Sequence, residues 1–348
     1  MKPRLTWTLQ AVCLLLFTPA AWADEFSFDE SESLPIVRGE NESSARDAGG
    51  LIEIRYNPPD GLQFEERVNR VVGSDYGERG MRIDTFSAVN HQKVRKMDGA
   101  YEVLMTIQRL GASLNGKPLQ NPFLEAMKGV KLVYRIGDAP GGHVMAHGIS
   151  GIDKVAENLR AGLPKGKPPP VEEEALQSEI MEKREMTDWN ARYGSWHNQY
   201  FVPGKVYYQI GTYTLEPGLF IRYGIAAKVV PGVSCHGGDS EQSCIRIRYD
   251  LGTEPELVEK ARKASIRHAM EFLKHGDVVG GQIEGYMERT IDPRTLMIYG
   301  ELHKKTILFP LSVDEGEVIR VRRIERVEYT YRYDHMPSGL SQVASSPN

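Results

Sequence analysis

The chain has 348 residues, of which 41% are apolar and 26% charged, and its formal net charge at pH 7 is −4. A chain of this length can bury a substantial core in one large or two modest domains. The mild negative charge and the lack of a basic block give no electrostatic footprint for nucleic acid or for an anionic membrane surface, so both classes of partner are excluded.

The first 23 residues have the three parts of a secretory signal peptide. Lys2 and Arg4 form a positive start, residues 11–17 form an apolar core, and Ala21-Trp22-Ala23 matches an A-x-A cleavage site. The apolar run is too short to cross a bilayer of about 30 Å, and acidic residues follow it directly. We therefore expect an exported protein, periplasmic or secreted, whose mature chain begins at Asp24 and has no transmembrane segment.

Three polar or proline-rich segments divide the rest of the chain. Residues 24–49 and 335–348 hold few large apolar side chains, so we expect a flexible leader and a flexible tail. The proline-rich residues 164–170 are typical of a semi-rigid linker. This linker separates a first, β-rich half (50–163) from a second, α+β half (171–334).

The first half is dominated by strands. Asp98-Gly99 and Asn115-Gly116 are turn signals, because these residues tolerate the positive φ angles of tight turns. A short helix over 151–163 is expected to close this half. Runs of β-branched and aromatic residues predict strands at 51–56, 61–72, 81–94, 101–110, 130–136 and 143–149.

The second half opens with a predicted helix, since three glutamates at 172–174 suit the first turn. Trp189, Tyr193, Trp196 and Tyr200 then recur at spacings of four, three and four. They could form an aromatic platform for a ligand, but we favour an amphipathic segment whose aromatic face packs on the sheet.

A second helix is predicted over 254–274, because Thr253-Glu254-Pro255-Glu256 matches a capping box. We expect the sheets to curl around this helix. Strands are predicted around it, at 206–215, 219–230, 243–250, 282–291, 296–308 and 318–334.

The last predicted strand alternates regularly, so one of its faces is expected to be buried and the other wet. On the apolar face, Val327, Tyr329, Tyr331 and Tyr333 form the candidate ligand-binding surface. Arg323 and Glu325 lie on the same face and interrupt its apolar series. They are either a charged pair within a ligand cavity or the end of a strand that has run past its core.

Cys235 and Cys244 form an even pair in a chain expected in an oxidising compartment, so a disulfide is predicted. A two-cysteine metal site with His236 and Asp239, or two free thiols, is the less favoured alternative, because zinc normally takes four close ligands.

No catalytic motif, metal site or cofactor site is expected. His143 and His147 fall in a predicted strand, where four residues separate them by roughly 13 Å, too far for one metal ion. His236, Asp239 and Ser240 lie close in sequence, but a triad must converge in space, so hydrated turn residues are favoured.

Four stretches resemble a group of exported bacterial proteins of uncharacterised function: Asp98 to Val103, Asn115-Gly116, Gly148 to Val155 and Ile291 to Thr295. The resemblance implies a β-rich domain with a curved antiparallel sheet, similar in outline to the half-barrels of periplasmic lipoprotein carriers.

The sequence thus predicts an α+β protein with curved, half-barrel-like antiparallel sheets around a core helix and with a helical connector. The leading functional hypothesis is non-enzymatic binding of an apolar small molecule or lipid-like group in a β-rich cavity. The alternatives are an interaction or assembly protein of the cell envelope, without a small-molecule ligand, and a hydrolase with an unrecognised site.

Overall fold

The structure is a computed structural model, and it describes residues 50–139, 143–162, 178–216, 219–235, 243–264, 281–312 and 318–335. The predicted signal peptide, the leader, the 164–170 linker and the tail after residue 335 lie outside these ranges. So does the stretch 265–274 of the predicted second helix.

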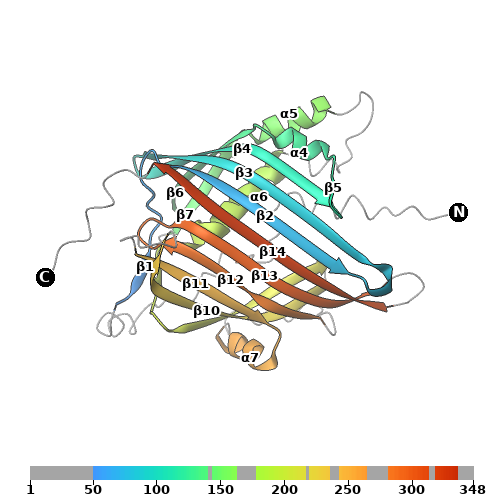
Figure 1. Cartoon of the computed structure of the whole chain (residues 1–348). Helices are drawn as coiled ribbons and strands as arrows, with labels where there is room; N and C mark the ends of the chain where they lie inside the picture. Colours follow the sequence, from blue (N-terminus) through green and yellow to red (C-terminus); the bar gives the residue numbers. More distant parts are fainter. Residues whose placement is uncertain are drawn as a thin grey trace.

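Almost all strands belong to one antiparallel sheet of 12 strands, in the order β7-β6-β4-β3-β2-β14-β13-β12-β11-β10-β9, with β5 beside β4 (Figure 1). Their bounds before the linker are β2 Gln63–Asp75, β3 Met81–Met97, β4 Ala100–Leu114, β5 Lys117–Pro118, β6 Lys131–Ala139 and β7 His143–Ser150. After it they are β9 Val206–Glu216, β10 Leu219–Ser234, β11 Ser243–Gly252, β12 Gln282–Asp292, β13 Met297–Ser312 and β14 Val318–His335.

Strands from both sides of the proline-rich segment share this sheet. The join is made by β2 and β14, which pair from Gln63 with His335 to Asp75 with Arg322. The predicted strands are confirmed, and most extend a few residues beyond the predicted bounds. The strand predicted at 51–56 is the exception, because only Ile52–Ile54 are paired. The Asp98-Gly99 turn is also confirmed, with Gly99 at φ 69° between paired Met97 and Ala100.

Four helices accompany the sheet in the described ranges: α4 Pro122–Met127, α5 Ile152–Gly162, α6 Ser178–Arg192 and α7 Pro255–Ala264. Two short 3-10 turns lie at Gly77–Arg79 and Gly194–Trp196. The helix expected over 151–163 is confirmed as α5. Helix α4 was not predicted from the sequence. The side chain of Asn121 caps its first turn by accepting a hydrogen bond from the Phe123 amide at 2.8 Å.

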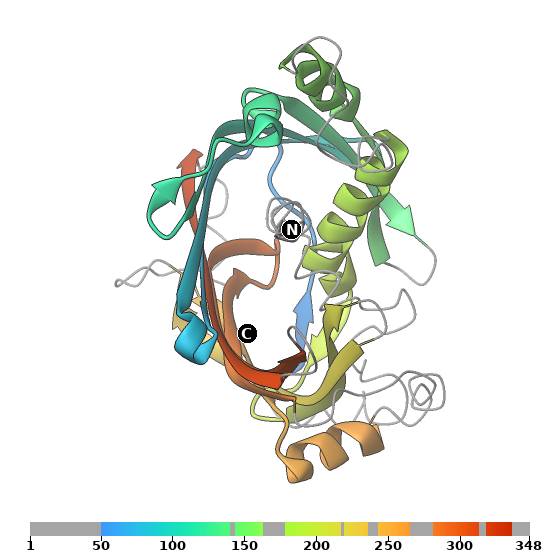
Figure 2. The same cartoon turned by 90° about the vertical axis from the view of Figure 1, so that its right-hand side faces the viewer.

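The sheet curves strongly, and α6 lies on the open side of the curve, opposite the central strands (Figure 2). The curved α+β fold around a helix is therefore confirmed. The helix inside the curve is, however, α6, the expected connector, and not the helix expected over 254–274.

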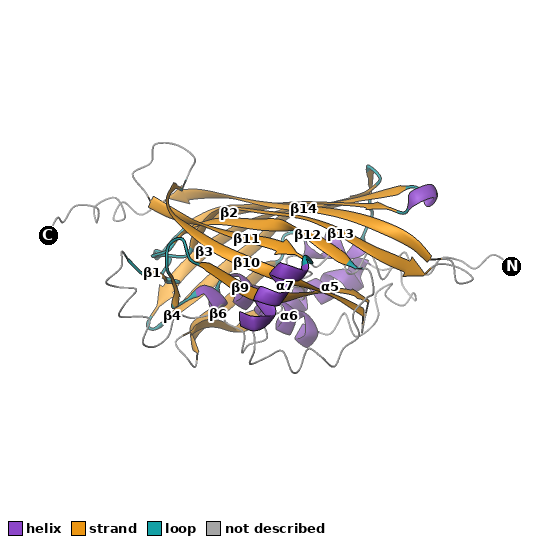
Figure 3. Ribbon diagram, turned by 90° about the horizontal axis from the view of Figure 1, so that it is seen from below, coloured by secondary structure: helices purple, strands orange, loops and turns teal. Residues whose placement is uncertain are grey.

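The described part of that second helix, α7, packs on the outside of the sheet (Figures 2 and 3). Its Leu257 lies against Gly224 of β10, where a Cβ atom would come within 2.6 Å of Leu257 Cγ. The neighbours of Gly224, Tyr223 and Ile225, point to the opposite, buried face. Of the predicted apolar stripe, Ala261 is buried and Leu257 and Val258 are half-buried. The amphipathic pattern thus predicted a packed face of the helix but not which face of the sheet it covers.

Helix α6 covers the free edge of β7. The side chain of Asn190 accepts a hydrogen bond from the Ala146 amide at 2.7 Å, and that of Glu182 accepts one from the Ile149 amide at 3.4 Å. An edge strand otherwise presents its amides to other chains, so α6 protects β7 from strand pairing.

One end of the concave face is filled by apolar side chains. A small second sheet, β1 Ile52–Ile54 with β8 Gln199–Phe201, lies there. Ile54, Phe201 and Trp196 are at most 2% exposed, and the Trp196 ring packs edge-on against Tyr249 of β11. We call this region the apolar end.

The predicted disulfide is confirmed. Cys235 and Cys244 are bonded, with their Cα atoms 5.2 Å apart, where β10 and β11 meet.

Candidate binding site on the concave face

Charged side chains interrupt the apolar pattern on the concave face of the central strands. Every second residue of β2 is buried, and this series contains Glu66 and Arg70 among Phe64, Val68 and Val72. In β13, the buried series is Glu301, His303, Lys305 and Ile307. The strand period therefore places these charges inside the curve, where burial is costly unless they are paired.

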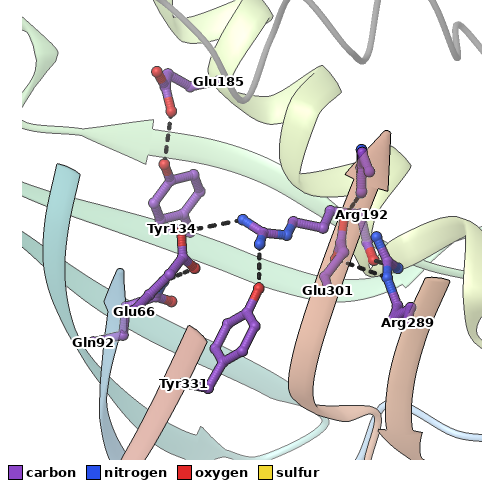
Figure 4. A network of polar contacts seen from close by, with 9 residues as sticks. Glu66, Gln92, Tyr134, Glu185, Arg192, Arg289, Glu301 and Tyr331 are labelled. Carbon is purple, nitrogen blue, oxygen red and sulfur yellow. Dashed lines mark hydrogen bonds and ion pairs between the residues drawn. The ribbon is translucent and has the colours of Figure 1, made fainter. Parts of the chain in front are cut away.

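The first group of buried charges, which we call the central network, is organised by Arg192 at the C-terminal end of α6 (Figure 4). Its guanidinium lies 3.2 Å from Glu66 and donates to the Tyr331 hydroxyl. It also lies 4.2 Å from the centre of the Tyr329 ring. Gln92 donates to the second oxygen of Glu66 at 3.1 Å. Arg192 thus anchors the end of α6 to β2 and β14.

Arg289 and Glu301 extend the central network to β12 and β13. Arg289 pairs with Glu301 at 2.9 Å and donates to the backbone carbonyl of Arg192 at 3.0 Å. His303 Nε2 lies 2.5 Å from the other oxygen of Glu301. The carboxylate of Glu301 is therefore held between an arginine and a histidine.

Burial and the neighbouring cations shift the pKa of Glu301 in opposite directions, and both lower the pKa of His303. Burial alone would raise the pKa of Glu301, but Arg289, His303 and Arg192 hold that pKa well below its ordinary value. Burial lowers the pKa of His303, and Glu301 offsets this only in part. The central network therefore contains a carboxylate that stays ionised and an imidazole that resists protonation.

The second group, which we call the basic cluster, gathers Arg70, Lys305 and Arg323 around Glu325. Their nitrogens lie 3.8, 3.4 and 2.6 Å from the Glu325 carboxylate. Tyr213 of β9, at the far edge of the sheet, donates to the same carboxylate at 3.4 Å. The side chains of the two sides of the curved sheet therefore meet at this level.

Aromatic side chains form a third group on the same face, toward the ends of β14 and β2. The rings of Phe64 and Tyr299 each lie 5.3 Å from the Tyr333 ring, and Phe64 lies 6.4 Å from Tyr331. Tyr331 and Tyr333 are only partly buried. The concave face of β14 therefore runs from charged to aromatic side chains.

The four residues of the predicted apolar face lie side by side on this surface. Val327 and Tyr329 are at most 3% exposed and pack with Val68 and Phe86, whereas Tyr331 and Tyr333 keep some exposure. Of the two interpretations of Arg323 and Glu325, the end of a strand beyond its core is wrong, and the charged pair within a ligand cavity stays a prediction. Glu325 is 1% exposed and lies inside the curve, so the strand has not run past its core.

The regularly spaced aromatic residues have a packing role, as favoured from the sequence. Trp189 and Trp196 are buried in the core, and Trp189 packs against Tyr56 and Tyr193.

Most of the buried charged residues were not predicted from the sequence, in particular Glu66, Arg70, Arg192, Glu301 and Lys305. The sequence did carry a signal for the charged residues of two strands, because they alternate with the same period as the apolar residues of the buried face. In β2 this series is Phe64, Glu66, Val68, Arg70 and Val72.

In the part of the chain that the structure describes, His, Cys, Asp and Glu side chains form no group that could hold a metal ion. His236, Asp239 and Ser240 lie outside that part. None of the described helices combines the length and the apolar character needed to cross a bilayer.

No family model matches the chain, and neither does any curated protein. Among solved structures, lipovitellin, studied for its lipid–protein interactions, aligns with 80% of this chain at 9% identity and a TM-score of 0.33, and the chain spans 26% of its length. DynF of the dynemicin biosynthesis pathway of Micromonospora chersina aligns with 86% of this chain and 90% of its own at 8% identity and a TM-score of 0.19. An outer membrane channel from Pseudomonas putida F1 aligns with 80% of this chain over 97% of its own length, at 7% identity and a TM-score of 0.20. TM-scores this low do not establish a common fold.

Proposed function

We propose that the chain is an exported protein that binds an apolar or lipid-like ligand on its concave face and does not act as an enzyme. One observation carries the proposal: Val327, Tyr329, Tyr331 and Tyr333 continue the same face of β14 that holds Arg323 and Glu325. A face that changes from charged to aromatic side chains along one strand matches an amphiphile, whose two ends differ in the same way.

Tyr331 and Tyr333 are the residues that contact the ligand in this proposal, because they are the partly exposed members of the strip. Val327 and Tyr329 support them from within the core. Partly exposed aromatic rings on a concave face offer a large apolar area at low entropic cost.

An apolar dye whose fluorescence depends on its surroundings tests the proposal. The dye is expected to bind the folded protein stoichiometrically, and Tyr333→Asp is expected to abolish the binding, because it places a carboxylate among Phe64, Tyr299 and Tyr331. Thr330→Asp, on the exposed face of the same strand, is the matched control and is expected to bind normally.

Tyr333→Leu keeps an apolar side chain and is expected to retain most of the binding, which separates loss of the site from loss of the fold. If the folded wild-type protein excludes the dye, or if Thr330→Asp and Tyr333→Asp behave alike, the concave face is not the site.

A second candidate, an assembly protein of the cell envelope, is favoured by a patch on the outer face. Ile83 and Ile324 flank Gly73 in one row across β3, β2 and β14, and Val71 lies in the next row. These three apolar side chains are 39–47% exposed. If this patch binds another protein chain, Ile324→Lys will dissociate the complex in size-exclusion chromatography and leave dye binding unchanged.

A further inference from the structure

One end of the concave face is closed by residues 55–62, which lead into β2. Backbone hydrogen bonds tie this segment to its neighbours: the Arg55 amide donates to Pro293 at 2.7 Å, and the Val94 amide donates to Leu62 at 2.8 Å. Leu62 is 1% exposed. Opening this end would break backbone hydrogen bonds and expose a fully buried core side chain, so this segment forms a fixed wall.

The concave face is also closed at the level of the basic cluster. Arg70 and Glu325 are 4% and 1% exposed there, and Tyr213, from the other side of the curve, donates to Glu325 at 3.4 Å. A ligand that came from this level would have to separate buried charged side chains before it reached Tyr331 and Tyr333. Breaking a buried ion pair is strongly unfavourable, so we exclude this route.

Helix α6 is the third boundary, on the open side of the curve (Figure 2). Polar side chains attach it to the sheet along its length. Glu182 and Asn190 accept hydrogen bonds from amides of β7, Glu185 accepts one from the Tyr134 hydroxyl at 2.8 Å, and Arg192 lies 3.2 Å from a carboxylate of β2. Water can replace each of these contacts when the helix moves, so each contributes little net free energy.

Apolar packing holds α6 at two positions among the residues that the structure describes. Met181 and Trp189 are its buried apolar side chains, at 5% and 7% exposure. A segment with few buried apolar contacts opens at a lower free energy than the core of the same protein. Of the three boundaries, α6 is therefore the one that can move.

Arg192 connects α6 directly to the proposed ligand site. Its guanidinium donates to the hydroxyl of Tyr331, one of the two residues proposed to contact the ligand (Figure 4). It also lies 4.2 Å from the centre of the Tyr329 ring. A ligand that reaches Tyr331 from the open side of the curve therefore has to pass the end of α6.

We propose that α6 is the gate of the concave face: it moves away from β7 and β14 to admit the ligand and returns once the ligand is bound. The inference rests on the proposed function. It also has a consequence that needs no ligand. When α6 is away, the amides of Ala146 and Ile149 lose their acceptors on the helix, so their hydrogen exchange reports the opening.

Binding kinetics of the neutral dye Nile red test the gate. Asn190→Ala removes the acceptor of the Ala146 amide and leaves Arg192, Tyr331 and Tyr333 unchanged. Association and dissociation are both expected to become about fivefold faster, as the loss of one hydrogen bond implies, while Kd changes less than about twofold. Lys183→Ala, at an exposed position of α6, is the matched control and is expected to keep the rates of the wild type.

Hydrogen exchange of the Ile149 amide, followed by NMR, tests the movement without a ligand. In Asn190→Ala this amide keeps Glu182 as its acceptor, so a purely local effect would leave its exchange unchanged. We expect it to exchange about fivefold faster in Asn190→Ala and at the wild-type rate in Lys183→Ala. Bound Nile red is expected to slow this exchange. Thermal melting shows that each variant is folded.

The outcomes separate the gate from the proposed function. If Asn190→Ala changes neither the binding rates nor the exchange of Ile149, α6 is a fixed wall and only the proposed function stands. Faster exchange with unchanged binding rates would mean that the ligand takes another route, and faster binding with unchanged exchange would contradict a movement of the whole helix. If the folded wild type takes up no dye, the proposed function fails and the gate fails with it.

Discussion

The apolar end and the basic cluster lie on the same concave face and are buried to a similar degree, yet their chemistry is opposite. Trp196 and Phe201 are 2% and 1% exposed, and Arg70 and Glu325 are 4% and 1% exposed. Burying the aromatic side chains stabilises the fold by about 25 cal/mol per Å² of apolar area. Burying the charges has a desolvation cost that their attraction repays only with excellent geometry. We therefore expect the apolar end to stabilise the protein and the basic cluster to contribute little to stability or to cost it.

The largest expected effect is at the apolar end. Trp196→Ala removes an indole packed against Phe201 and Tyr249, and it is expected to lower the free energy of unfolding by about 3–5 kcal/mol. Denaturant unfolding measures the change. A loss below about 1 kcal/mol would mean that this end is loosely packed and would remove the contrast with the basic cluster.

At the basic cluster, replacing the buried side chains is not expected to lower the free energy of unfolding. Replacing Arg70 and Lys305 by Met and Glu325 by Leu in one triple variant removes the buried charges and keeps similar volumes. The free energy of unfolding is expected to stay constant or to rise by up to about 4 kcal/mol, with Arg323, which is 28% exposed, left hydrated. Glu325→Leu alone is the control and should destabilise, because it removes the carboxylate that the three cations surround. A triple variant less stable than this single one would show that the charges hold the fold together.

The pH dependence of stability sharpens the comparison at the central network. Because the pKa of His303 is lowered in the folded state, the unfolded chain binds a proton first as the pH falls through about 6.5. The contribution of His303 to the free energy of unfolding is therefore fully present above that pH. Below it, the free energy of unfolding declines by at most about 1.4 kcal/mol per pH unit. Glu301, whose folded pKa is also lowered, adds a further loss below about pH 4.3. Unfolding curves of the wild type and of His303→Gln between pH 5 and 7.5 should differ in slope, and parallel curves would contradict this account.

The smallest effect is expected outside the curve. Lys260→Ala on α7 removes an exposed pair with Glu256 at 2.7 Å, and the free energy of unfolding should change by less than about 0.5 kcal/mol. Ala261→Asp, at the one buried position of α7, is the matched test of whether the helix is docked. It should destabilise far more in the same denaturant measurement.

The sequence predicted the strands and the faces of β14 because alternation is a local property. Val327, Tyr329 and the exposed Arg326 follow from a period of two alone. The place of α7 could not be predicted in this way, since both faces of β10 carry small or apolar residues and the glycine that admits Leu257 has no pattern of its own.

The charged groups of the site were harder to predict because they come from distant parts of the chain. Glu66, Arg192 and Glu301 meet only after β2, α6 and β13 have assembled. Within one strand, Arg323 and Glu325 did signal an interior charge. Their partners Arg70 and Lys305 became identifiable only through the register of β2 and β13 with β14.

The pairing of β2 with β14 has a consequence for the order in which the protein folds. Gln63 pairs with His335, so the middle of the sheet joins strands from the two ends of the described chain. Contacts of such wide sequence separation form slowly, because the intervening chain must be ordered before they gain anything. The hairpins on either side, β13 with β14 among them, are local and are expected to form early. The basic cluster and the central network are complete only once β14 also pairs with β2. The concave face proposed to bind a ligand is therefore expected to be completed late in folding, when this pairing joins two preformed halves of the sheet.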